Sequence, residues 1–285
     1  MRELKLLLIV SIITGVLYWG VEPLAHSVMH PAVTPADYTF SDLEKIDLSK
    51  GDSALGSELA SANCIACHSI KSQGFDAPVD NESASASYGV VPPDLSSAGL
   101  IYEDNYLANF IKEPTKAAHV AHVFNDSKPY PMPAYNWMSD EEIAHIVAYF
   151  KSIAPKQLSN KEVFADACQR CHGMKYDSLA PITPEATLAS YMGSAAPDLS
   201  MMIRSKGANY LHTFINEPQK QLHGTAMPRV GLTEQAQAQV VSYIESIGDS
   251  KKAEREDIGI KSMLFMAFMS ILAYLWKRKI WSEVH

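Results

Sequence analysis

Cysteine and basic side chains are both scarce in this chain of 285 residues. Only four cysteines occur, and all four lie in two short motifs, so none remains for a structural disulfide. The 24 lysines and arginines are outnumbered by 32 acidic residues, and the net charge of −8 argues against a nucleic-acid partner. Runs of β-branched residues are missing on either side of the cysteines, which argues against a thioredoxin-like redox dithiol.

The two motifs are copies of one pattern, Cys-x-x-Cys-His, and lie 104 positions apart. Zinc ribbons place their cysteine pairs about 15–20 residues apart, so the spacing does not fit a zinc site. The pattern is instead the attachment motif of c-type haem, in which both thiols bond to the porphyrin and the histidine binds the iron. We therefore expect two covalently bound haem c groups. The expected ligand sets are Cys64, Cys67 and His68 in one copy and Cys168, Cys171 and His172 in the other.

Two apolar stretches lie outside the region of the motifs. No clear small-x-small cleavage site follows the first, so we expect residues 1–21 to be an uncleaved signal anchor rather than a signal peptide. Residues 258–276 span about one membrane thickness, and Lys277, Arg278 and Lys279 follow them. The positive-inside rule assigns this basic cluster to the cytoplasm. The motifs are then expected on the periplasmic side of a bacterial inner membrane, unless residues 258–276 form a buried core helix.

Between the two stretches, the sequence divides into two similar domains. Residues 51–153 contain the first motif, and residues 160–247 contain the second. Pro93-Asp94-Leu95-Ser96 returns at the same offset of 104 as Pro197-Asp198-Leu199-Ser200. After Pro114 the offset falls to 95, which places nine extra residues in the first copy. The remaining segments are a tether at 22–50 with Pro23, Pro31 and Pro35, linkers at 154–159 and 248–257, and a cytoplasmic tail at 277–285.

Apolar periodicity predicts that both domains are mainly α-helical. Leu55, Leu59 and Ala62 share one face of a short helix that ends at the first motif. Each domain also contains a capping box, Ser139 to Glu142 and Ser159 to Glu162, which marks the start of a helix. The apolar positions of the last helices are Ile143, Ile146, Val147 and Phe150 in the first domain and Val240, Val241, Ile244 and Ile247 in the second.

Each iron needs a second axial ligand, and its identity separates electron transfer from small-molecule chemistry. Met132 and Met227 both stand beside proline shortly before the last helix of a domain, where a rigid loop can hold a thioether against the ring. They are the expected ligands. The alternatives are that these methionines pack in the core, or that His119 and His223, which also match at an offset of 104, bind the iron instead.

A histidine that binds a metal normally donates its other ring N–H to a carbonyl, which fixes its orientation. Pro93 and Pro197 are the candidates for this carbonyl, because each domain places Pro-Asp-Leu after its motif. The alternative is that Pro-Asp-Leu forms a plain turn. The candidates for holding haem propionates are Arg204, Tyr88 and Trp137.

The order of Cys-x-x-Cys-His, Pro-Asp-Leu and Met-Pro before a last helix resembles the class I cytochrome c fold, once in each domain. With its flanking transmembrane helices, the chain resembles the dihaem cytochrome c1 subunit of some bacterial cytochrome bc1 complexes. The resemblance implies a mainly α protein with two tandem class I cytochrome c domains. It also implies cytochrome b and Rieske iron–sulfur subunits as partners, and a soluble cytochrome c or terminal oxidase as electron acceptor. Such a subunit belongs to a quinol–cytochrome c reductase, and we do not expect it to be catalytic alone.

Two other functions remain open from the sequence. The dihaem subunit of cbb3-type oxidase also has two such domains, but it is anchored from its N-terminal side. A dihaem cytochrome c peroxidase would need one iron with an open coordination position. The first domain carries 13 acidic and 5 basic side chains, against 8 and 7 in the second. We therefore expect the first domain to steer a basic soluble cytochrome, unless its charge serves only solubility.

Overall fold

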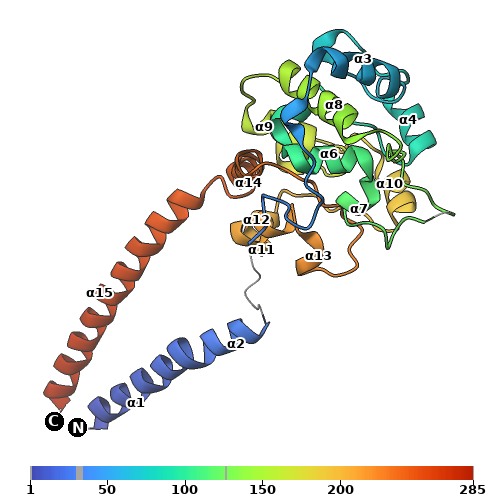
Figure 1. Ribbon diagram of the computed structural model, residues 1–285. Coiled ribbons are helices and arrows are strands. Elements are labelled where there is room, and N and C mark those ends of the chain that lie inside the picture. The colour runs from blue at the N-terminus through green and yellow to red at the C-terminus, as the bar shows by residue number, and fades with distance from the viewer. Residues whose placement is uncertain (1, 30–34, 126, 285) are drawn as a thin grey trace.

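The computed structural model describes residues 2–29, 35–125 and 127–284, and within them the chain is mainly helical and has no β-strand. A body of short helices carries two long helices that leave it on the same side, and the N- and C-termini lie close together at their far ends (Figure 1). The expected architecture of helical domains flanked by an apolar helix at each end is confirmed.

The two domains repeat the same order of helices. In the described residues each domain has six α-helices, and four of the six pairs begin 104 positions apart. The first domain contains α3 (Ser53–Asn63), α4 (Asn81–Tyr88), α5 (Ala98–Ile101), α6 (Asp104–Lys112), α7 (Pro114–Ala117) and α8 (Asp140–Ile153). The second contains α9 (Asn160–Ala167), α10 (Glu185–Met192), α11 (Met202–Lys206), α12 (Ala208–Phe214), α13 (Pro218–Gln221) and α14 (Glu234–Gly248).

Each domain has its own core, and its last helix is central to it. α8 packs on α3 and α5, while α14 packs on α9 and α11. The two predicted capping boxes are confirmed, since Ser139 and Ser159 each exchange hydrogen bonds with the glutamate three residues later. The predicted apolar faces of both last helices are buried, except that Ile247 is only partly so. Tyr102, which ends α5, contacts both cores and so lies at the junction of the domains.

The helix that leads into the first motif buries different residues from those predicted. A Cβ atom on Gly56 would lie 1.9 Å from the carbonyl oxygen of His145 in α8, so the two backbones are in direct contact there. Gly56 and Ala60 therefore form the buried face of α3, because only small residues allow this approach. Of the predicted face, Leu59 packs partly buried against the core of the first domain, whereas Leu55 is 47% exposed and Ala62 is exposed. The prediction is therefore confirmed at Leu59 and wrong at Leu55 and Ala62.

The predicted tether at 22–50 differs from the structure at both of its ends. The N-terminal helix continues from α1 (Arg2–Val16) through a π-helical turn at Leu17–Val21 into α2 (Glu22–Met29). The π turn directly precedes Pro23, which has no N–H to donate, and such turns absorb changes in helical hydrogen bonding. Residues 30–34, which include His30 and Pro31, lie outside the described residues.

Residues 36–46 form a packed segment, here called the strap. Phe40 has no exposed surface, and its ring lies 5.1 Å from the ring of Tyr106 in α6. Ile46 is also buried, and its N–H donates to Asn105. The Tyr38 hydroxyl accepts a hydrogen bond of 2.6 Å from Gln237 in α14. The strap therefore contacts both domains.

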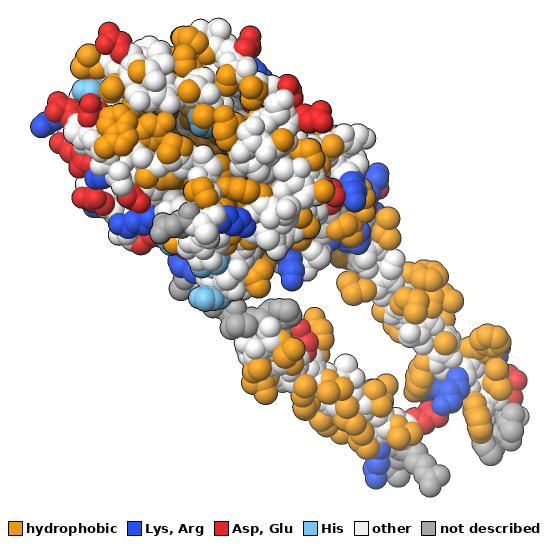
Figure 2. Space-filling view, turned by 90° about the vertical axis from the view of Figure 1, so that its right-hand side faces the viewer, with side chains coloured by type: hydrophobic (Ala, Val, Ile, Leu, Met, Phe, Trp, Pro, Cys, Tyr) orange, Lys and Arg blue, Asp and Glu red, His pale blue; other side chains and the backbone are white. Residues whose placement is uncertain are grey.

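The C-terminal helix, α15 (Lys252–Val284), is longer than the predicted 258–276. α15 therefore contains most of the residues predicted as a linker (248–257) and most of those predicted as a cytoplasmic tail (277–285). Residues 3–29 and 252–283 have windows of mean hydropathy 2.0 and 1.8 and are long enough to cross a membrane. Apolar side chains cover both helices along their length (Figure 2). Lys277 of α15 forms an ion pair with Glu3 of α1, so the two helices meet at their far ends.

Candidate haem sites

The two Cys-x-x-Cys-His motifs adopt the same backbone turn. Cys64 ends α3, and its carbonyl oxygen accepts the N–H groups of Cys67 at 3.1 Å and His68 at 2.9 Å. The corresponding bonds to the Cys168 carbonyl in the second domain have the same lengths. All four thiols are free. Burial raises the pKa of Cys64 to about 11 and that of Cys168 to about 12, so both thiols are protonated at neutral pH.

Each motif histidine makes the hydrogen bond to a proline carbonyl that was predicted for it. His68 Nδ1 lies 2.8 Å from the carbonyl oxygen of Pro93, and His172 Nδ1 lies 2.8 Å from that of Pro197. A carbonyl can only accept, so Nδ1 carries the proton in each ring and Nε2 keeps its lone pair. Burial lowers the pKa of both imidazoles, although the hydrogen bonds to the carbonyls oppose this. Each ring is therefore held neutral with Nε2 available to a metal.

The Pro-Asp-Leu-Ser segments hold these carbonyls in place. The N–H of Leu95 donates to the Ser69 carbonyl at 2.9 Å, and Asp94 accepts the Ser69 hydroxyl at 2.8 Å. In the second domain the N–H of Leu199 donates to the Gly173 carbonyl at 3.0 Å. Each segment is thus bonded directly to the residue after its motif. The alternative of a plain turn does not account for these contacts.

The described residues separate the candidates for the second axial ligand. Met132 is partly buried against the core that Cys64 also contacts, while Met227 is half-buried on a loop. His119 Nε2 lies 3.0 Å from a carboxylate oxygen of Asp42 in the strap, and His223 is exposed. His119 is therefore occupied by another partner, which favours the methionines. Met132 and Met227 stay the predicted ligands.

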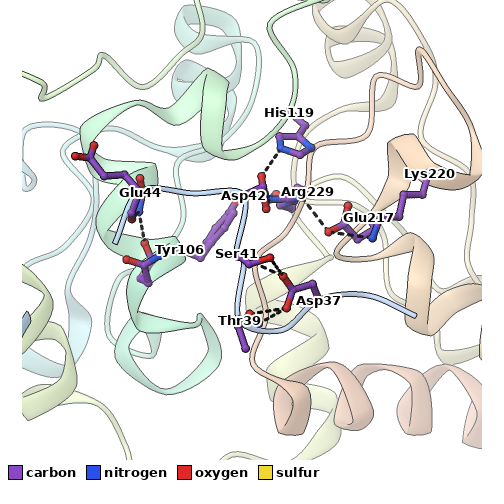
Figure 3. Close-up of polar contacts among 12 residues, drawn as sticks. Asp37, Thr39, Ser41, Asp42, Glu44, Tyr106, His119, Glu217, Lys220 and Arg229 are labelled. Atoms are coloured by element: carbon purple, nitrogen blue, oxygen red, sulfur yellow. Dashed lines mark hydrogen bonds and ion pairs between the residues drawn. The ribbon is translucent and has the colours of Figure 1, made fainter. Parts of the chain in front are cut away.

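An ion cluster of Asp42, Glu217 and Arg229 has one member close in the chain to Met227, and Figure 3 shows these three side chains. Two residues after Met227, Arg229 donates from Nη1 to both carboxylate oxygens of Asp42 and from Nη2 to Glu217, at 2.9 Å in each case. The side chain of Arg229 is only 2% exposed. Its backbone N–H donates to the Ala118 carbonyl of the first domain at 2.8 Å. The strap and both domains therefore meet at Arg229.

The charges in this cluster stabilise one another. Burial raises the pKa of Asp42, but the hydrogen bonds and positive charge of Arg229, together with His119, outweigh burial and hold that pKa below its ordinary value. The Arg229 guanidinium also lies over the Phe40 ring, 5.4 Å from its centroid. Asp42 is therefore a carboxylate at neutral pH and fixes the strap to the second domain.

The nine residues that only the first copy contains join the two domains. They fall within residues 115–131, where Phe124 lies 5.5 Å from the ring of Tyr191 in α10. The Tyr191 hydroxyl donates to the Pro129 carbonyl at 2.7 Å. His122 Nε2 lies 3.0 Å from the carbonyl oxygen of Thr225, two residues before Met227. This segment of the first domain thus supports the loop that carries the predicted ligand of the second.

Of the residues suggested for propionates, the Tyr88 hydroxyl lies 3.8 Å from the Cys67 sulfur, while Trp137 is 66% exposed and Arg204 is exposed on α11. Their role in holding propionates stays a prediction. The cluster of Asp42, Glu217 and Arg229 escaped the sequence analysis. The available signal was small, namely that Arg229 stands two residues after Met227 where the first copy has Ala134.

The donor set in each domain fits a covalently attached haem. Two free thiols, one neutral imidazole with a fixed tautomer and one thioether on a supported loop are the groups that c-type attachment and Met/His ligation use. Among the described residues, no three His, Cys, Asp or Glu side chains are placed to hold a metal ion by themselves. The cysteine pairs therefore do not meet in a four-ligand site of the zinc-ribbon type.

Comparison with known proteins agrees with this chemistry. The chain matches the family described as cytochrome c twice, over residues 53–154 and over residues 160–248, which is more than half of its length. No curated protein matches it. Among solved structures, a chain described as "Hyperthermophilic respiratory Complex III" is 20% identical with a TM-score of 0.35, and the match covers 44% of this chain and 75% of that chain.

Proposed function

Because the chain belongs to the cytochrome c family, with one family domain in each half, we propose that it is a membrane-anchored dihaem cytochrome c that relays single electrons. In this proposal it is the cytochrome c1 subunit of a bacterial quinol–cytochrome c reductase. A Rieske iron–sulfur subunit is its electron donor, cytochrome b is a further partner, and a soluble cytochrome c or terminal oxidase is the acceptor. Two haem c groups are bound, one in each domain.

The observation that carries this proposal is the duplication of one complete site. Both domains have a free thiol pair, and both have an imidazole whose Nδ1 lies 2.8 Å from a proline carbonyl. A single site would suit a carrier that meets its partners one at a time. Two sites in one body suit a relay in which donor and acceptor dock on different domains.

The residues of each site have distinct roles. Cys64 and Cys67 would hold the first haem covalently, and Cys168 and Cys171 the second. His68 and His172 would bind iron through Nε2. A bound haem supplies a one-electron iron couple. Pro93 and Pro197 keep the imidazoles oriented, and Met132 and Met227 would close the sixth position, which disfavours peroxidase chemistry because that needs an open one.

The two apolar helices support a membrane location. Both are fully exposed in the isolated chain, and they meet at their far ends through Glu3 and Lys277. Exposed apolar helices of this length require a lipid environment or partner helices. With the basic cluster at 277–279 in the cytoplasm, both domains lie on the periplasmic side of the inner membrane.

Haem content tests the cofactor assignment directly. The intact chain is expected to have the mass of the polypeptide plus two haems. Cys64→Ser/Cys67→Ser and Cys168→Ser/Cys171→Ser are each expected to reduce this to one haem. An unmodified polypeptide mass would refute the assignment.

Co-purification tests the assignment to a complex. Mild detergent extraction is expected to retain a cytochrome b and a Rieske protein with the chain. Recovery with a copper–haem oxidase would instead support the cbb3-type alternative. Turnover of hydrogen peroxide by the purified chain would support the peroxidase alternative, and two low-spin six-coordinate haems in every redox state would count against it.

The excess of acidic side chains in the first domain suggests where a soluble acceptor docks. A basic cytochrome would be steered to this domain, and its association rate would then fall as salt is added. Stopped-flow oxidation of the reduced chain at several ionic strengths measures this. A rate that does not depend on salt would remove the steering role and leave the charge as a solubility feature.

A further inference from the structure

The third residue of the second motif is a partly buried arginine with no counterpart in the first. Arg170 stands where the first motif has Ala66. Its Nε atom is buried and has no hydrogen-bond partner among the described residues. No ion pair of the described residues includes Arg170. Arg229, by contrast, has an unpaired Nε but binds two carboxylates through its other nitrogens.

A cation in this position is costly without an anion. Burying a charged group that lacks a partner costs several kcal/mol, and a guanidinium cannot escape that cost by losing its proton. The strongest electrostatic neighbours of Arg170 are tyrosines and cysteines, which are neutral at pH 7. The protein itself therefore leaves the charge of Arg170 uncompensated.

The guanidinium acts on the first domain although its backbone belongs to the second. Burial raises the pKa of Tyr130 to about 12, and the charge of Arg170 opposes that rise. Tyr102 and Tyr130 are among the strongest electrostatic neighbours of Arg170, and both belong to the first domain. The charge of Arg170 therefore lies near the first domain.

A chain of hydrogen bonds fixes Arg170 across the domain junction. Its carbonyl oxygen accepts the N–H of Thr183 at 3.1 Å, and the Thr183 hydroxyl accepts the N–H of Val91 at 3.1 Å. Thr183 has no exposed surface. Val91 lies two residues before Pro93, whose carbonyl orients His68. The second motif is therefore tied through buried backbone to the residue that positions the first imidazole.

We propose that Arg170 binds a carboxylate of the haem attached to the first domain, so that the second motif supplies the anion site for the first haem. Haem brings carboxylates of its own, and Arg170 is a partly buried cation that forms no ion pair among the described residues. The hydroxyl groups of Tyr102 and Tyr130, which are electrostatic neighbours of Arg170, can add hydrogen bonds to the same carboxylate. The inference rests on the proposed function in one respect only, which is that a haem is attached at Cys64 and Cys67.

The positive charge also sets the reduction potential of the first haem. Reduction removes one unit of positive charge from the iron, so a nearby fixed cation favours the reduced form. Arg170→Gln is expected to lower the potential of the first haem. A tenfold change in its reduction equilibrium is expected, on the order of 59 mV for a one-electron couple. The potential of the second haem is expected to stay unchanged.

Spectroelectrochemical titration of the detergent-solubilised full chain measures both potentials. The Cys64→Ser/Cys67→Ser variant keeps only the second haem and so identifies which potential belongs to it. Lys206→Gln is the control, because Lys206 is an exposed basic residue of the same domain and should shift neither potential. If Arg170→Gln fails to take up haem, Arg170→Lys is measured in its place. Lysine keeps the positive charge but lacks the planar guanidinium, so this variant should lower the potential of the first haem by less than Arg170→Gln would.

The outcomes separate this inference from the proposed function. A shift confined to the first haem supports it. Equal shifts of both haems, a shift of the second alone or no shift beyond that of Lys206→Gln overturns it. Absence of haem from Cys64 and Cys67 in the intact mass of the wild-type chain would refute the proposed function instead, independently of any potential.

Discussion

Replacing Arg229 with glutamine tests how much the ion cluster contributes to the joint between the strap and the two domains. The substitution removes three hydrogen bonds of 2.9 Å to Asp42 and Glu217. It leaves Glu217, which is 6% exposed, with Lys220 at 3.7 Å as its one cationic partner among the described residues. The bond from the backbone N–H of position 229 to Ala118 remains.

The magnitude follows from the burial of these partners. Breaking a buried ion pair by removing one member costs about 3–5 kcal/mol, because the other charge is left uncompensated. The side chains of Arg229 and Glu217 are 2% and 6% exposed, so this range applies to their pair. Asp42 is 42% exposed and can regain water, so its share is small. We expect Arg229→Gln to lower the free energy of unfolding by about 3–5 kcal/mol.

Urea unfolding of the detergent-solubilised full chain, followed by Soret absorbance, measures this loss. Lys112→Gln is the control, since Lys112 also has two carboxylate partners but they lie at the surface, and its loss should cost less than about 1 kcal/mol. A lower urea midpoint with unchanged slope is expected for Arg229→Gln. If the two variants were equally stable, the cluster would not hold the domains and this reasoning would be refuted.

Three further predictions address the ligand, the strap and the core. Met227→Ala should open the sixth position of the second haem, so that the reduced chain binds carbon monoxide. The control Met138→Ala, at a core position 3% exposed, should lower the free energy of unfolding by about 2–5 kcal/mol without binding carbon monoxide. Carbon monoxide binding by neither variant or by both would count against Met227 as the ligand. The pKa of Asp42 is lower in the folded chain than in the unfolded one. Its contribution to folding stability is therefore complete above its ordinary pKa of 3.8 and is lost as pH falls through the lower pKa of the folded chain. Asp42→Asn should lower the free energy of unfolding by about 1–2 kcal/mol at pH 7, and in urea titrations its difference from wild type should shrink below about pH 4. A difference that does not depend on pH would contradict the ion pair. Gly56→Ala should destabilise the first domain by about 3 kcal/mol in thermal unfolding, at the upper end of the usual cost of overpacking, because its Cβ would meet a backbone oxygen. Gly259→Ala, with open space around it, should not, and equal melting temperatures for the two variants would contradict the close contact of α3 and α8.

Local features of the chain were predictable from the sequence. The thiols and imidazole of each motif lie within five consecutive residues, so one turn of backbone is enough to bring them together. The capping boxes at Ser139 and Ser159 likewise depend on residues three positions apart. The hydrogen bonds from His68 to Pro93 and from His172 to Pro197 span 25 residues, and the repeat suggested them because the same proline recurs at the same distance from each motif.

Other features were decided by the tertiary structure alone. Asp42 and Arg229 are 187 residues apart, and the sequence around each of them gives no sign that they form an ion pair. The strap was predicted to be part of a tether because prolines punctuate the segment 22–50, yet Phe40 is fully buried once both domains surround it. Arg170 lies inside the clearest motif of the sequence, but only the packing of one domain on the other brings it near Tyr102 and Tyr130 of the first domain. The physical reason is the same in each case: the energy of a charge or an aromatic ring depends on what excludes water from it, and those groups come from distant parts of the chain.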